Sequence, residues 1–69
     1  MKGIRKPYSE NEFLLKSLQS ARLELNEAAS LFNELTDNDA IDYASYNLLA
    51  ARTRYSYLLK LAKEKQLSL

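Results

Sequence analysis

Apolar residues recur at alternating spacings of three and four in each half of the chain. Such spacing keeps side chains on one face of an α-helix. We therefore predict an all-α protein whose two helices cover residues 10–35 and 38–65, joined by a turn at 36–38. The apolar positions are Leu14, Leu18, Ala21, Leu25, Ala28, Phe32 and Leu35 in the first half and Ile41, Ala44, Leu48, Ala51, Tyr55, Leu58 and Ala62 in the second.

The two sets of apolar positions complement each other in size when the chain folds back on itself. An antiparallel arrangement places a large residue opposite a small one in nearly every layer, which is what a densely packed core requires. This pattern predicts an antiparallel, coiled-coil-like helical hairpin over residues 9–69, preceded by a flexible basic arm at residues 1–8. The opposed pairs are Phe32 with Ala44, Ala28 with Leu48, Leu25 with Ala51, Ala21 with Tyr55 and Leu14 with Ala62.

Polar residues mark the start of both helices. Ser9 followed by Glu12 has the spacing of a capping box, in which each side chain bonds to the backbone N–H of the other residue. Asp37 is the best N-cap for the second helix, because its carboxylate can accept from the unpaired N–H groups of the first turn. These signals set the expected helix starts.

The length of the chain limits how stable one hairpin can be. A domain of 69 residues gains little from apolar burial beyond the conformational entropy that it loses on folding. Disulfides and metal ions stabilise many small proteins, but this chain has no Cys and no His. We therefore expect self-association, with two hairpins forming a four-helix bundle as a homodimer, or binding to a partner protein.

The second helix carries more apolar residues than its seam needs. A stripe on one flank comprises Tyr43, Ala50, Tyr57 and Leu61, and Leu31 of the first helix lies on the same side. Exposed stripes of this kind mark interaction surfaces, and tyrosine suits them because its ring is buried while its hydroxyl stays hydrated. The other interpretation is that the tyrosines lie flat over the hairpin as a cover.

Charge is unevenly distributed although the net charge is only +1. The hairpin brings the N-terminal residues and the C-terminal end together, and both are rich in lysine. One hypothesis is that this end makes non-specific phosphate contacts with nucleic acid or anionic lipid. Lysines are also common at a helix C-terminus, because the negative end of the helix dipole stabilises a positive charge there. The residues concerned are Lys2, Arg5, Lys6, Lys60, Lys63 and Lys65.

Three arginines lie on the flanks of the seam, and their surroundings differ. Arg54 can reach Glu24 across the hairpin, which predicts a surface ion pair. Arg22 faces Arg52 on the opposite flank, where no acidic residue is placed to form an ion pair with either of them. This second pair either holds an anion or a carboxylate from a partner, or extends into water.

Catalysis has little support in the sequence. Without His and Cys, and with Gly3 as the single glycine, the chain offers no imidazole base, no thiol nucleophile and no glycine-rich phosphate-binding loop. Capping accounts for the acids near Asp37, so we expect neither a metal nor a cofactor, and no small-molecule substrate. No signal peptide or membrane-spanning segment is evident, which makes a soluble cytoplasmic protein the expectation.

Four stretches in the second half of the chain form a recognisable pattern: Thr36 to Tyr46, Ala50-Ala51, Arg54 to Leu59 and Lys60 to Glu64. This pattern resembles the YaaL-like family of short bacterial proteins of unknown function, with a looser match over the first helix. A proline often follows the capping Asp in that family, whereas Asn38 stands here. The resemblance implies a small helical protein with no assigned activity and no catalytic or binding residues. Some family members are encoded beside a recombination-repair gene, which implies a link to DNA metabolism.

Together these observations favour a small non-enzymatic interaction protein that self-associates or binds a partner through its second helix. One alternative is non-specific nucleic-acid binding through the lysine-rich end. A further alternative is an obligate subunit of a larger complex.

Overall fold

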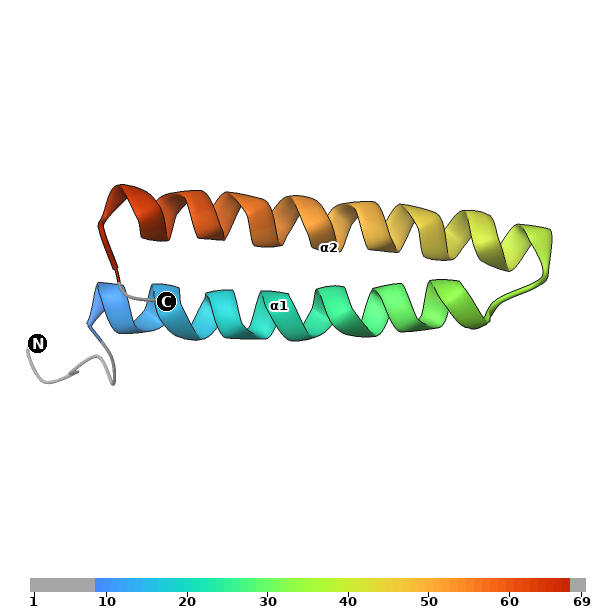
Figure 1. Ribbon diagram of the computed structural model, residues 1–69, viewed down its shortest axis with the longest axis horizontal. Helices are drawn as coiled ribbons and strands as arrows, with labels where there is room; N and C mark the ends of the chain where they lie inside the picture. Colours follow the sequence, from blue (N-terminus) through green and yellow to red (C-terminus); the bar gives the residue numbers. More distant parts are fainter. Residues whose placement is uncertain (1–8, 68–69) are drawn as a thin grey trace, which may run out of the picture.

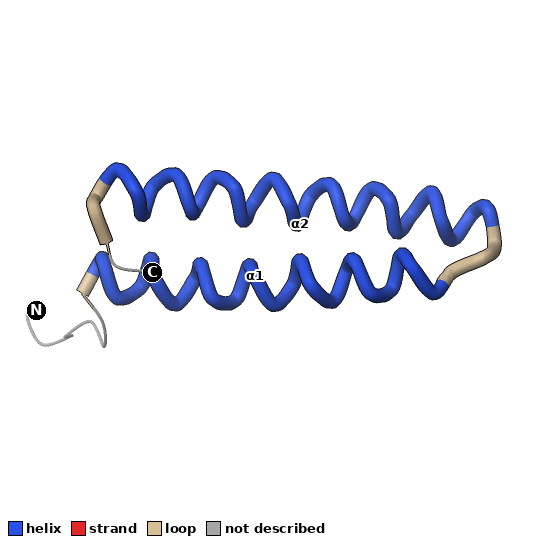
Figure 2. The backbone as a smooth tube through the Cα atoms, viewed as in Figure 1, coloured by secondary structure: helices blue, strands red, loops and turns tan. Residues whose placement is uncertain are grey.

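The protein is a pair of antiparallel helices joined by a short loop. The computed structural model describes residues 9–67. Helix α1 spans Glu10–Glu34 and helix α2 spans Asn38–Glu64, and they lie side by side along their whole length (Figure 1). Short loops follow each helix, and no strand occurs in the described part of the chain (Figure 2). The prediction of an all-α, two-helix fold is confirmed, and each helix ends one residue before the expected position.

Both helices begin with the expected caps. Ser9 Oγ accepts from the N–H of Glu12 at 3.1 Å, and Glu12 Oε1 accepts from the N–H of Ser9 at 2.9 Å, which forms the predicted capping box. Asp37 Oδ2 accepts from the N–H of Ala40 at 3.1 Å. These bonds satisfy backbone donors that lack a partner inside their helix.

The core is the seam between α1 and α2. All fourteen seam positions predicted from the spacing are buried or half-buried. The five buried residues are Leu14, Leu18, Ala21, Ala44 and Ala62, and all belong to the seam. Three of the five are alanines, so the two backbones approach closely while the larger side chains cover the edges.

The C-terminal end of α2 closes in a way that the sequence did not indicate. Gln66 has a positive φ of 58°, its N–H bonds to the carbonyl of Lys63, and the N–H of Leu67 bonds to the carbonyl of Ala62. This is a Schellman motif, a helix end that usually has glycine at the position of Gln66. The motif turns Leu67 back onto the cluster of Leu14, Leu18 and Ala62.

The flank of the seam carries the predicted ion pair. Arg54 Nη1 donates to Glu24 Oε1, and the two side chains remain 44% and 54% exposed. At that exposure the pair contributes little to stability, about 0.5 kcal/mol. The pair is consistent with the register that the packing of the seam sets.

Exchange of one large–small pair tests the packing of the seam. Ala62→Leu should lower the free energy of unfolding by about 1–3 kcal/mol through overpacking, and Leu14→Ala by about 2–5 kcal/mol through a cavity. The double variant should lose at least about 1 kcal/mol less than the two single losses combined, because the volumes then match again. Denaturant unfolding at a fixed protein concentration measures this. Strict additivity would contradict the opposition of these two residues.

Replacement of Gln66 by glycine tests the helix end. Gln66→Gly should raise the free energy of unfolding by about 0.5–1 kcal/mol, because glycine adopts a positive φ without a steric penalty from Cβ. Gln66→Ala is the matched control, since alanine keeps that penalty. Thermal unfolding followed by circular dichroism distinguishes the two variants, and equal stability of both would argue against the left-handed conformation.

Candidate interaction surface

The side of α2 that faces away from α1 exposes a group of large apolar side chains. Tyr43, Tyr46, Leu49 and Tyr57 are 67%, 71%, 60% and 60% exposed, and Ala50 is exposed between them. A solvated helix face normally carries polar residues. We call these five residues the outer face of α2.

The outer face has a regular spacing of its own. Four of its residues and Thr53 form a line that we call the outer line: Tyr43, Tyr46, Ala50, Thr53 and Tyr57 follow one another at intervals of three, four, three and four, as the seam residues do on the opposite side. A shallow and mainly apolar hollow lies over the middle of this line, lined by Tyr46, Leu49, Ala50, Thr53, Arg54 and Tyr57. Ala50 is the smallest of these residues, so large side chains surround a central low point.

Four of the five residues in the stripe predicted from the sequence are exposed, and the fifth is half-buried. Tyr43, Ala50 and Tyr57 lie on the outer face, and Leu31 of α1 is exposed on the flank. Leu61 instead is half-buried and packs against the cluster of Leu14, Leu18 and Ala62. Packing within the hairpin therefore covers much of the Leu61 side chain.

Sequence reasoning left Tyr46 and Leu49 out of the predicted stripe. Both are among the most exposed large side chains of the described chain. The signal that would have included Tyr46 is the regular three-four spacing through Tyr43 and Ala50. The centre of the exposed face consequently lies opposite α1 rather than on the flank beside Leu31.

The two arginines on the other flank are free within the hairpin. Arg22 and Arg52 are both exposed, and no hydrogen bond or ion pair within residues 9–67 engages either of them. Arg52 also lines a shallow hollow with Asp42, Ser45, Tyr46, Leu48 and Leu49. This hollow thus combines a cation and a carboxylate with apolar surface.

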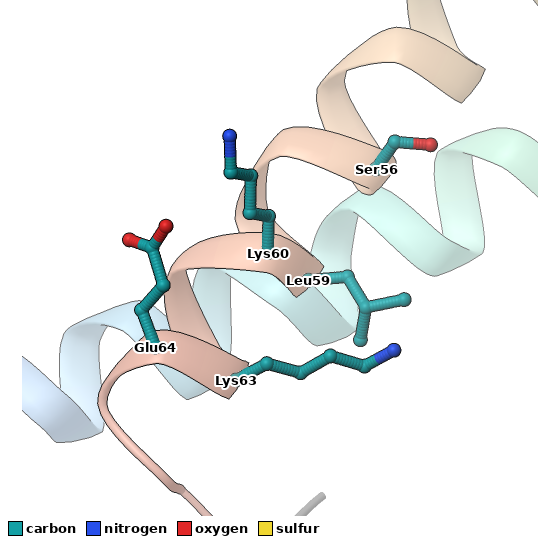
Figure 3. A pocket seen from close by; sticks show the side chains of 5 residues that line it. All are labelled: Ser56, Leu59, Lys60, Lys63 and Glu64. Atoms are coloured by element: carbon teal, nitrogen blue, oxygen red, sulfur yellow. The ribbon is translucent and has the colours of Figure 1, made fainter.

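The lysine-rich end is only partly described. Lys60 and Lys63 line a shallow hollow with Ser56, Leu59 and Glu64, and Lys60 and Glu64 extend from neighbouring turns on the same side (Figure 3). Lys65 is the C-cap residue of α2. Since Glu64 stands four residues after Lys60, its carboxylate weakens the positive potential there. Lys2, Arg5 and Lys6 lie outside the described residues.

The described residues show neither a metal-ligand cluster nor a buried polar atom without a partner. No cluster of three or more His, Cys, Asp or Glu side chains with metal-binding geometry occurs in residues 9–67. No buried polar side-chain atom in this part lacks a hydrogen-bond partner. Neither described helix is both long enough and apolar enough to cross a bilayer. The outer face of α2 is thus the strongest candidate site.

Comparison with known proteins identifies the family but no activity. A family model described as "Protein of unknown function (DUF2508)" matches residues 1–69. No curated protein matches the chain, and no solved structure does. The match agrees with the resemblance to YaaL, which is a member of that family. The chain therefore belongs to the DUF2508 family of proteins of unknown function.

Proposed function

We propose that this chain is a small non-enzymatic interaction protein that associates through the outer face of α2. The observation that carries the proposal is the exposure of three tyrosines and a leucine on one side of a helix whose opposite side already packs on α1. Contiguous apolar surface of this kind is typical of protein interfaces. Its tyrosines are among the residues most enriched there.

The thin core of the hairpin supplies the energetic reason for association. Only five of the described residues are buried, and every large side chain among them keeps at least 2% of its surface exposed. Two helices that share one seam bury little apolar area for each residue that they order. Covering the outer face of α2 adds a second layer of burial. Association therefore serves the fold as well as any function built on it.

The available area is suited to a protein interface. An aromatic side chain buries about 150–250 Å² when fully covered. Because Tyr43, Tyr46 and Tyr57 remain 60–71% exposed, the three rings together offer roughly 400 Å². That is about half of the roughly 800 Å² that each partner contributes to a standard interface. Leu49, Ala50 and the neighbouring polar residues supply the rest.

A non-enzymatic role agrees with the chemistry of the chain. The sequence has no His, no Cys and one Gly, and the exposed hollows combine tyrosine, leucine and lysine side chains without a buried polar group. Binding without catalysis needs no perturbed acid or base. The absence of cysteine also suits the reducing cytoplasm, which we include in the proposal.

Charge substitutions on the outer face test the proposal. Tyr46→Glu with Tyr57→Glu should abolish association and reduce helicity, because two carboxylates cannot be buried unpaired in the contact. Both side chains project away from the seam, so α1–α2 packing is not directly altered. Sedimentation equilibrium gives the mass and circular dichroism the helicity.

Leu23→Glu on α1 is the matched control, because Leu23 is 58% exposed and lies on the other helix. It should leave the mass unchanged. If the Tyr46 and Tyr57 substitutions also leave mass and helicity unchanged, the outer face of α2 is not the interaction surface. A poorly helical wild-type monomer would indicate that the partner is a different protein.

A further inference from the structure

We propose that the outer face of α2 binds a second copy of the same chain, with the two α2 helices antiparallel and in one defined register. The inference rests on the proposed function and adds the identity of the partner and the residues that meet. Three features support it: the spacing of the outer face, the sizes of its residues and the position of its charges.

The outer face repeats the pattern by which α1 and α2 already pack. Its line continues from Tyr43, Tyr46, Ala50, Thr53 and Tyr57 to Lys60 at the same alternating spacing. Two such lines on identical helices can interdigitate when a twofold axis relates them. Each contact then occurs twice, because residue i on one copy meets residue j on the other and the reverse also holds.

The residue sizes select the antiparallel register. Centring the axis between residues 50 and 53 places Ala50 opposite Thr53 of the second copy, so the smallest residues meet where the helices approach most closely. The next layer outward places Tyr46 opposite Tyr57 of the second copy. Beyond it, Tyr43 meets the aliphatic stem of Lys60 of the second copy, which can lie along the ring. Large side chains thus surround the small centre on both sides.

The charges that flank the line are complementary in this register. In the hairpin, the Glu24–Arg54 ion pair joins the residues that directly precede Leu25 and Tyr55 of the seam. The equivalent positions beside the outer line are Asp42 and Lys63, which precede Tyr43 and Glu64. The same geometry therefore brings Asp42 of each copy to Lys63 of the other, giving two ion pairs per dimer.

Other arrangements lose these features. A parallel pair of α2 helices puts Asp42 of one copy and Lys63 of the other at opposite ends of the contact, so neither ion pair can form. A shift of one heptad in either direction separates the ion pairs and removes the Tyr46–Tyr57 layer. In the proposed register the outermost layer brings Asp39 near Glu64 of the second copy, so the contact ends there with both carboxylates in water.

Charge reversal at Asp42 and Lys63 tests the register. Asp42→Lys should weaken dimerisation by about tenfold or more, and so should Lys63→Asp, because each variant creates two like-charge contacts per dimer. The double variant Asp42→Lys/Lys63→Asp should return to within about threefold of the wild-type dissociation constant. An equimolar mixture of the two single variants should form heterodimers, since both of its cross-contacts are attractive. Sedimentation equilibrium at low and high salt measures each case.

The double variant also controls for effects on the helix itself. A cation near the N-terminus of α2 and an anion near its C-terminus both oppose the helix dipole, and the double variant carries both penalties. Recovery of dimerisation therefore cannot come from a more stable helix. Lys65→Asp is the matched single control, because it makes the same change of charge at the C-cap, away from the outer line. It should leave dimerisation within about threefold of the wild type.

Two results would overturn the inference. A wild-type chain that stays monomeric at high micromolar concentration excludes the second copy as the occupant. A double variant that dimerises no better than the weaker single variant excludes this register. If the glutamate substitutions at Tyr46 and Tyr57 still abolish association in the second case, the proposed function stands and only the arrangement of the copies is wrong. If those substitutions have no effect either, the proposed function fails as well.

Discussion

The packing of large against small side chains along one seam is the interaction on which the rest of this protein depends. Alanines at positions 21, 44 and 62 let α1 and α2 approach closely, while leucines and larger residues fill the edges. The caps at Ser9 and Asp37 and the Glu24–Arg54 ion pair act on this arrangement from outside. They define where the helices begin and how they align. The two caps and the ion pair each contribute less to the free energy of folding than the seam does, because all three are exposed.

The same seam is also the reason why we propose a partner. A two-helix layer has a single buried line, so each helix keeps a full opposite side in water. On α1 that side is mainly polar, with Leu23 and Phe13 as separate exposed residues, whereas on α2 the apolar residues form a continuous line. This asymmetry makes α2 the interaction surface in the proposal.

Most of the fold could be predicted from the sequence, because the spacing of apolar residues and the helix caps are local properties of the chain. The seam, both N-caps and the Glu24–Arg54 ion pair were predicted from the positions of residues along the chain. The turn at Gln66 was not, since the usual glycine is absent and Leu67 is held by tertiary contacts with Leu14 and Leu18. Leu61 and Tyr46 differed from the predicted site for a related reason. The sequence gives the angular position of each side chain, but the neighbouring helix decides how much of it is covered.

Association stabilises a folded chain by mass action, so the decisive measurement is thermal stability as a function of protein concentration. Self-association predicts that the midpoint of helix unfolding rises steadily over about a hundredfold increase in concentration, in one cooperative transition. A midpoint independent of concentration, in a fully helical chain with a mass of 7.9 kDa, would contradict it. The hairpin would then be stable alone, and the outer face of α2 would have no structural reason to be covered.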